Sequence, residues 1–177
     1  MPRYRARAVG IEMARGPCAA RRTCIEILVQ KTSMLAAKPP VIAAEARLVF
    51  HHVGVACDDL RSEQRQFELL GYTAQGDIFE DRIQGVRGLF MGGQAPRVEL
   101  LEPLDASPGV LSVWLSQRIK LYHLAYTVPN VVAAIDALRK QRAKVVVHPV
   151  AAVAFAGRFI AFLMLRNRLL IELISLE

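Results

Sequence analysis

The sequence has little of several features that define whole classes of protein. It has only three cysteines in 177 residues, an odd number without the paired spacing of a zinc site or a disulfide framework. It has no run of 18 apolar residues, so we expect no membrane-spanning helix. Charged residues make up 22% of the chain and apolar residues 53%, which predicts a folded globular protein. These features favour a reduced, cytoplasmic protein that does not bind membranes.

Acidic residues are nearly absent from the first 40 positions. This segment holds eight Lys or Arg residues and two acids, so it supplies +6 of the net charge of +7. The rest of the chain is close to neutral, and a nucleic-acid partner is therefore not expected. We interpret residues 1–45 as a basic, disordered N-terminal extension. A transit peptide and a start site at Met34 are alternatives on composition.

An internal repeat is the strongest pattern in the chain. HVGVACDDL at 52–60 aligns with HLAYTVPNV at 123–131, and RVELL at 97–101 aligns with LIELI at 170–174. In each unit, alternating apolar residues predict strands and one stretch of helical spacing predicts a helix, in the order βαβββ. A short helix is expected near 111–117, in the connection. The expected elements are 48–56, 60–70, 72–80, 85–92 and 96–102, then 121–128, 130–142, 144–148, 157–165 and 168–175.

Each unit carries one histidine and one glutamate at matching positions. His52 precedes Glu99 by 47 residues, and His123 precedes Glu172 by 49. Both glutamates stand among apolar strand residues, where an unpaired carboxylate is costly to bury. A pseudo-twofold axis between two facing sheets would bring the four side chains into one cleft. Two imidazoles and two carboxylates suit Co, Ni, Mn, Fe or Zn, so we predict one divalent metal ion.

Other polar residues are expected to lie outside this group. In a regular strand His51 points away from His52, and Glu102 points away from Glu99 into solvent. Gln84 and Tyr126 are possible substrate contacts. Five arginines are expected to be solvated strand-edge charges, with a role in holding a carboxylate or phosphate as the alternative: Arg87, Arg97, Arg158, Arg166 and Arg168.

These segments resemble the vicinal-oxygen-chelate superfamily, and within it the methylmalonyl-CoA epimerase-like proteins. The resemblance covers about residues 47–176 in four ordered pieces: HHVGVACDDL, GVRGLFMGGQAPRVELLEPL, YHLAYTVPNV and GRFIAFLMLRNRLLIELI. It implies an α+β fold over residues 46–177. In that fold, two βαβββ modules, at about 47–104 and 120–177, form a cupped mixed sheet around a metal ion. It also implies that the ligands are His52, Glu99, His123 and Glu172.

The resemblance further implies a reaction. Epimerases of this branch exchange a proton alpha to a thioester carbonyl with glutamate bases, which makes Glu172 and Glu99 the candidate catalytic residues. It implies a small-molecule substrate such as an acyl-CoA, and a homodimer. The separate glutamate base of those epimerases has only shifted matches here, Glu80 and Asp81, so the second base and the substrate stay open.

Two other functions fit the same pattern. One is a glyoxalase-type lyase that uses the same four ligands on the thiol adduct of a ketoaldehyde. The other is a non-catalytic protein that binds a small molecule within the same fold.

Overall fold

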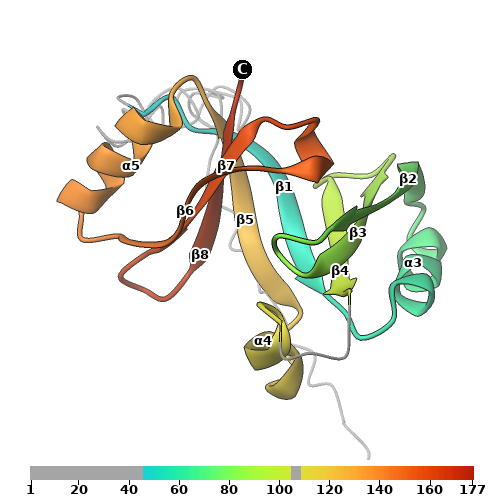
Figure 1. Ribbon diagram of the computed structural model, residues 1–177. Coiled ribbons are helices and arrows are strands. Elements are labelled where there is room, and N and C mark those ends of the chain that lie inside the picture. Colours follow the sequence, from blue (N-terminus) through green and yellow to red (C-terminus); the bar gives the residue numbers. More distant parts are fainter. Residues whose placement is uncertain (1–45, 105–108) are drawn as a thin grey trace, which may run out of the picture. The chain divides into compact units, whose positions relative to one another are not determined.

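The repeat is visible directly in the order of helices and strands. The computed structural model describes residues 46–104 and 109–177, so the expectation of a disordered extension at 1–45 lies outside the described residues. Two βαβββ modules follow each other, joined by the short helix α4 (Ser112–Ser116) (Figure 1). Every expected element is present, with boundaries within three residues of the prediction.

The first module consists of β1 (Val49–Ala56), α3 (Leu60–Leu69), β2 (Thr73–Asp81), β3 (Val86–Gly92) and β4 (Val98–Pro103). The second consists of β5 (Leu121–Val128), α5 (Val131–Lys140), β6 (Lys144–Ala151), β7 (Phe159–Met164) and β8 (Leu170–Ser175). Its one addition is the 3-10 helix η1 (Val153–Phe155), which no sequence pattern had predicted.

Equivalent capping residues start the two long helices. Asp59 Oδ1 accepts a hydrogen bond from the backbone N–H of Ser62 at 2.7 Å, and Asn130 Oδ1 accepts one from Ala133 at 2.9 Å. Both caps have extended backbone angles, as helix N-caps require. The repeat therefore extends to the side chains that end each strand and begin each helix.

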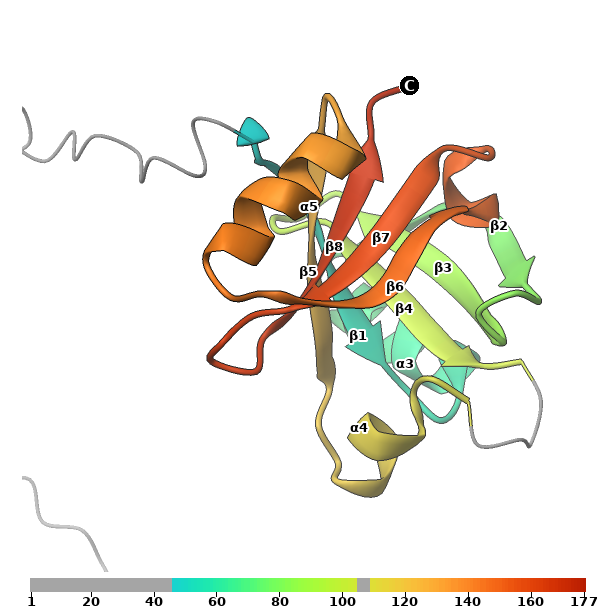
Figure 2. The same ribbon diagram turned by 60° about the vertical axis from the view of Figure 1, so that its left-hand side comes forward.

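All eight strands form one open sheet, in the order β2-β3-β4-β1-β5-β8-β7-β6. The modules meet where β1 and β5 pair antiparallel, and each of these strands pairs in parallel with the last strand of its own module. The α+β fold with one cupped mixed sheet, which the resemblance implied, is therefore confirmed, and the two facing sheets considered from the repeat are the two halves of this one sheet. One strongly curved sheet brings its outer strands round, so that η1 contacts β2 (Figures 1 and 2).

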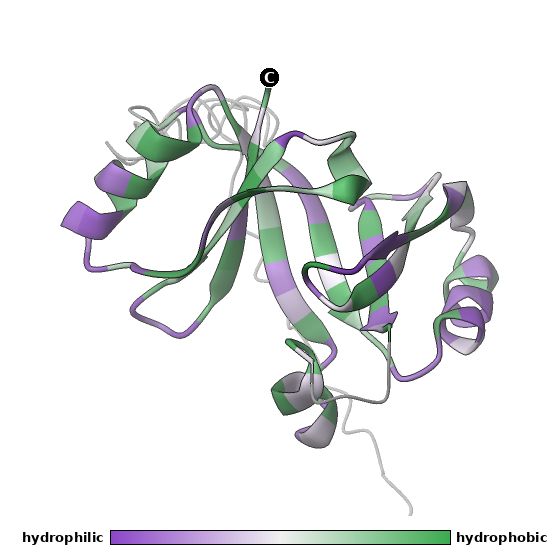
Figure 3. Cartoon of the chain, viewed as in Figure 1, coloured by the Kyte–Doolittle hydropathy of each residue, from purple (hydrophilic) through white to green (hydrophobic). Residues whose placement is uncertain are grey.

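Helices α3 and α5 cover the outer face of this curved sheet, and the inner face forms the cup (Figures 1 and 2). Hydrophilic and hydrophobic residues alternate along the central strands (Figure 3). The inner face is lined by a cluster of aromatic and aliphatic side chains that includes Phe90, Tyr122, Phe155 and Phe162. No helix in the described ranges is long and apolar enough to cross a membrane.

Candidate metal centre

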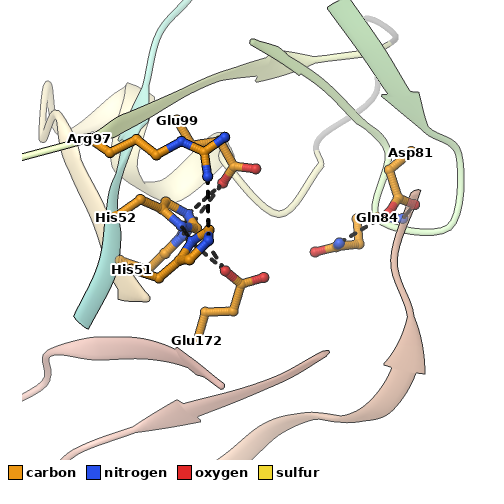
Figure 4. Close-up of polar contacts among 8 residues, drawn as sticks. His51, His52, Asp81, Gln84, Arg97, Glu99 and Glu172 are labelled. Atoms are coloured by element: carbon orange, nitrogen blue, oxygen red, sulfur yellow. Dashed lines mark hydrogen bonds and ion pairs between the residues drawn. The ribbon is translucent and has the colours of Figure 1, made fainter. Parts of the chain in front are cut away.

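The four side chains predicted from the repeat come together at the bottom of the cup. Their potential ligand atoms all lie within 4.8 Å of one another, and all four residues are buried. His52 Nε2 is 3.1 Å from both Glu99 Oε2 and His123 Nε2. Glu172 Oε2 lies 3.6 Å from His52 Nε2 and 3.5 Å from His123 Nε2. Figure 4 shows His52, Glu99 and Glu172 facing one another.

The register of the central strands explains this convergence. Gly54 of β1 is paired with Glu99 on one side and with His123 on the other. Ala125, which is paired with His52 across β1 and β5, is also paired with Glu172 of β8. The same arrangement therefore occurs twice about the β1–β5 junction, so each module contributes one imidazole and one carboxylate.

The absence of a side chain at Gly54 leaves room for the His123 ring. A Cβ atom at position 54 would lie 2.3 Å from His123 Cε1 and 2.4 Å from its Nδ1, well inside van der Waals contact. The ring thus lies close against the backbone of β1, where only glycine leaves room.

Burial dominates the electrostatics of the group. It lowers the pKa of His52 and of His123 to about 3, so both rings are neutral and each has a lone pair to offer. Burial also raises the pKa of Glu99 to about 7 and the pKa of Glu172 well above its ordinary value, the second with a further contribution from the Glu99 charge.

The donor set fits a divalent cation. Two buried atoms, His123 Nδ1 and Glu172 Oε2, have no hydrogen-bond partner, and no Lys or Arg of the described residues forms an ion pair with either glutamate. Two glutamates without an ion-paired Lys or Arg among the described residues, next to two neutral imidazoles, are suited to a borderline or hard metal ion. The charge of Arg97 lowers the pKa of Glu99 without forming an ion pair, and a cation would add positive charge in direct contact with both carboxylates.

A small cavity of about 20 Å³ adjoins the group, which is room for one water molecule. Its polar lining consists of Gln84, Glu99, His123 and Glu172, and its other walls are aliphatic or aromatic. None of the five arginines considered from the sequence lines it. A group in this cavity would therefore lie beside both glutamates and in otherwise apolar surroundings.

His51 does not point away from His52, and that expectation is wrong. The pairing of β1 with β5 is irregular between Phe50 and His52, which breaks the alternation of side chains. The His51 and His52 rings lie edge to face, with Nδ1 atoms 2.7 Å apart. The sequence alone held no signal for this bulge.

Glu102 is buried rather than exposed, so its expected place in solvent is also wrong. It does face away from Glu99, but helix α3 covers that side of β4. Its carboxylate accepts a hydrogen bond from the backbone N–H of Leu60 at 2.6 Å, at the start of α3, and pairs with Arg87. This carboxylate holds the helix to the sheet.

The two shifted candidates for a second base have other roles. Asp81 is buried and accepts hydrogen bonds from the backbone of Ile83 and Gln84 and from the Gln84 side chain, which shapes the β2–β3 turn (Figure 4). Glu80 lies at the surface, 3.7 Å from Arg82. Neither carboxylate belongs to the buried group.

Comparison with known proteins identifies the family. The model of the Glyoxalase/Bleomycin resistance protein/Dioxygenase superfamily matches residues 51–162, and the chain belongs to this superfamily. The resemblance inferred from the sequence is thereby confirmed. A search of curated proteins found no match.

Solved structures with this fold include methylmalonyl-CoA epimerases. The enzyme from Mycobacterium tuberculosis is 26% identical, with a TM-score of 0.61 over 71% of this chain and 86% of that one. A Streptomyces coelicolor methylmalonyl-CoA epimerase variant in complex with 2-nitronate-propionyl-CoA is 22% identical, with a TM-score of 0.61 over 71% and 95%. A hypothetical protein from Bacillus halodurans is 21% identical, with a TM-score of 0.64 over 73% and 95%.

Proposed function

We propose that this chain is a metal-dependent epimerase or isomerase that exchanges a proton alpha to the carbonyl of a small acid or acyl thioester. The observation that carries the proposal is the convergence of two neutral imidazoles and two glutamates, without an ion-paired Lys or Arg among the described residues, beside a mostly apolar cavity. His52, Glu99, His123 and Glu172 would hold the cation, which is Co, Ni, Mn, Fe or Zn. When bound, it would supply a Lewis acid that stabilises charge developing on a carbonyl oxygen.

The residues around the cavity would have different roles in the proposed reaction. Glu99 and Glu172 reach the cavity from different modules, so a carboxylate on each side could take up and return a proton. The two histidines stay neutral and offer lone pairs rather than protons. The other walls are aliphatic and aromatic, so a substrate group that enters between the two glutamates would do so in largely apolar surroundings.

An acyl thioester is the first substrate class to test, because similar structures are methylmalonyl-CoA epimerases. Purified protein would be analysed for bound metals and then incubated with methylmalonyl-CoA and other acyl-CoAs in deuterated water. Metal-dependent deuterium incorporation at the alpha carbon supports the proposal. A metal-loaded protein that exchanges no proton in any acyl thioester would contradict it.

The same purified protein can be used to test the two alternative functions, a glyoxalase-type lyase and a non-catalytic binding protein. Incubation with methylglyoxal and glutathione or bacillithiol tests for a glyoxalase-type lyase, since turnover consumes the thiol adduct. A protein that retains no metal, and whose melting temperature is unaffected by chelation, would instead fit a non-catalytic binder.

Metal binding should stabilise the folded chain. A cation at 100 times its dissociation constant adds about 2.7 kcal/mol to the free energy of unfolding, because it binds the assembled group but not the separated side chains. Differential scanning fluorimetry with Co²⁺ or Zn²⁺, and with a chelator, measures the shift. The His123→Ala variant should show no shift, and an equal shift in that variant would place the cation elsewhere.

Metal affinity should rise with pH through neutrality. Burial raises the pKa of Glu99 to about 7 and the pKa of Glu172 well above its ordinary value, so both must lose a proton to bind a cation, whereas His52, with a pKa of about 3, is already neutral above pH 5. Affinity is therefore lost as the pH falls, by about tenfold per unit for each displaced proton. Co²⁺ titrations between pH 5.5 and 7.5 test this, and Glu99→Gln should make the profile less steep.

A further inference from the structure

His51 connects Arg97 to the candidate metal centre through a chain of hydrogen bonds. Arg97 Nη1 lies 3.3 Å from His51 Nε2, and His51 Nδ1 lies 2.7 Å from His52 Nδ1. On its other side, His52 Nε2 is 3.1 Å from Glu99 Oε2. Figure 4 shows Arg97, His51 and His52 together on one side of the group.

Arg97 is held in this place by two further contacts. Its Nε donates to Gln75 Oε1 at 2.8 Å, and its guanidinium carbon lies 4.1 Å from the centre of the Phe90 ring. The guanidinium is therefore a fixed donor rather than a mobile surface charge.

Arg97 determines the direction of donation along this series of hydrogen bonds. A guanidinium can only donate, so His51 Nε2 accepts from it. The neutral His51 ring then carries its proton on Nδ1 and donates it to His52 Nδ1. As a result, His52 carries its own proton on Nε2 and donates it to Glu99. Each of the three contacts then has one donor and one acceptor.

A cation on His52 requires the hydrogen bond between His52 and His51 to be donated in the opposite direction. The metal needs the lone pair of Nε2, so the proton of the His52 ring must be on Nδ1. His52 Nδ1 then donates to His51 Nδ1, and His51 carries its proton on Nε2, facing the guanidinium. Two donors cannot share that contact.

We propose that His51 is a positioning residue that couples the metal centre to Arg97. With a cation on His52, the proton in the 2.7 Å contact would lie on His52 Nδ1. His52 Nε2 would give up its proton and His51 Nε2 would take one up, so the two rings would keep two protons in total. Arg97 would then be released from His51. This inference rests on the proposed metal function.

Imidazole tautomers can be read directly in the unaltered protein. Long-range ¹H–¹⁵N NMR should find His51 protonated on Nδ1 and His52 on Nε2 without metal, and both reversed after Zn²⁺ is added. If Zn²⁺ binds His52 and His51 keeps its tautomer, the coupling is wrong. If Zn²⁺ does not bind the four residues at all, the proposed metal function fails, and this inference fails with it.

A double-mutant cycle tests the same coupling by Zn²⁺ affinity, measured in competition with a chromophoric chelator. Arg97→Met keeps an apolar stem over Phe90 and removes the competing donor, so Zn²⁺ should bind roughly tenfold more tightly. His51→Phe leaves the His52 Nδ1 proton without an acceptor, so Zn²⁺ should bind at least about tenfold more weakly.

The combined variant separates the coupling from simple charge repulsion. With Phe at position 51, the change Arg97→Met has no hydrogen bond left to remove, so it should alter Zn²⁺ affinity little. Equal tightening with His and with Phe at position 51 would mean that Arg97 only repels the cation, and would overturn the proposal.

Discussion

Replacing Glu172 with Gln should reduce proton exchange at the alpha carbon by about 10²- to 10⁴-fold, the usual contribution of a positioned acid or base. The amide retains the size of the side chain and one oxygen that could still face a cation, but it cannot take up a proton. Glu172 is buried, lines the cavity and has an oxygen without a hydrogen-bond partner, so little else should compensate. The measurement is the rate of deuterium incorporation in metal-saturated protein.

The control is Glu68→Gln on the exposed side of α3, where the carboxylate accepts a hydrogen bond from Gln64 of the same helix. This variant should exchange protons at the unaltered rate. Should Glu172→Gln retain full exchange with metal bound, Glu172 is a ligand without a proton-transfer role, and Glu99 becomes the base to test.

Replacing Gly54 with Ala should strongly weaken metal binding and also destabilise the fold. The added Cβ would overlap the His123 ring, since it would lie 2.3 Å from Cε1. The ring would have to leave its position, and overpacking of this kind costs about 1–3 kcal/mol. We expect a melting temperature lower by several degrees and a metal affinity at least about 100-fold weaker, measured by denaturation and by Co²⁺ titration.

A second variant shows whether the overlap is the cause. In the His123→Ala background there is no ring to displace, so Gly54→Ala should then change the free energy of unfolding only slightly. If Gly54→Ala lowers the free energy of unfolding as much in that background as in the unaltered chain, the glycine is required by the backbone of β1 and not by His123.

The sequence predicted most of the fold, and it predicted that four polar side chains converge, because both follow from periodicity. A repeat of about 70 residues carries its strands, caps and buried polar residues with it, so Asp59 and Asn130, or Glu99 and Glu172, could be paired without coordinates. Metal binding by the four residues is still a prediction.

The misplaced residues depend on contacts that periodicity does not contain. Strand alternation predicts that His51 points away from His52, but a local bulge interrupts that alternation. It also predicts that Glu102 faces away from Glu99 into solvent, but a helix covers that side of the sheet. Whether the modules form one sheet or two depends on the pairing of β1 with β5. The residue pattern of a strand does not show which other strand it pairs with.

The junction between β1 and β5 gives a bound cation a mechanical role besides a chemical one. Half of the donor set lies on each side of this junction, so a cation held as proposed would cross-link the two halves of the domain. The halves could then separate only after the ion had dissociated. Amide hydrogens in the centre of β1 and β5 should therefore exchange with solvent more slowly in the metal-loaded protein, whereas those at the outer strands β2 and β6 should be far less affected.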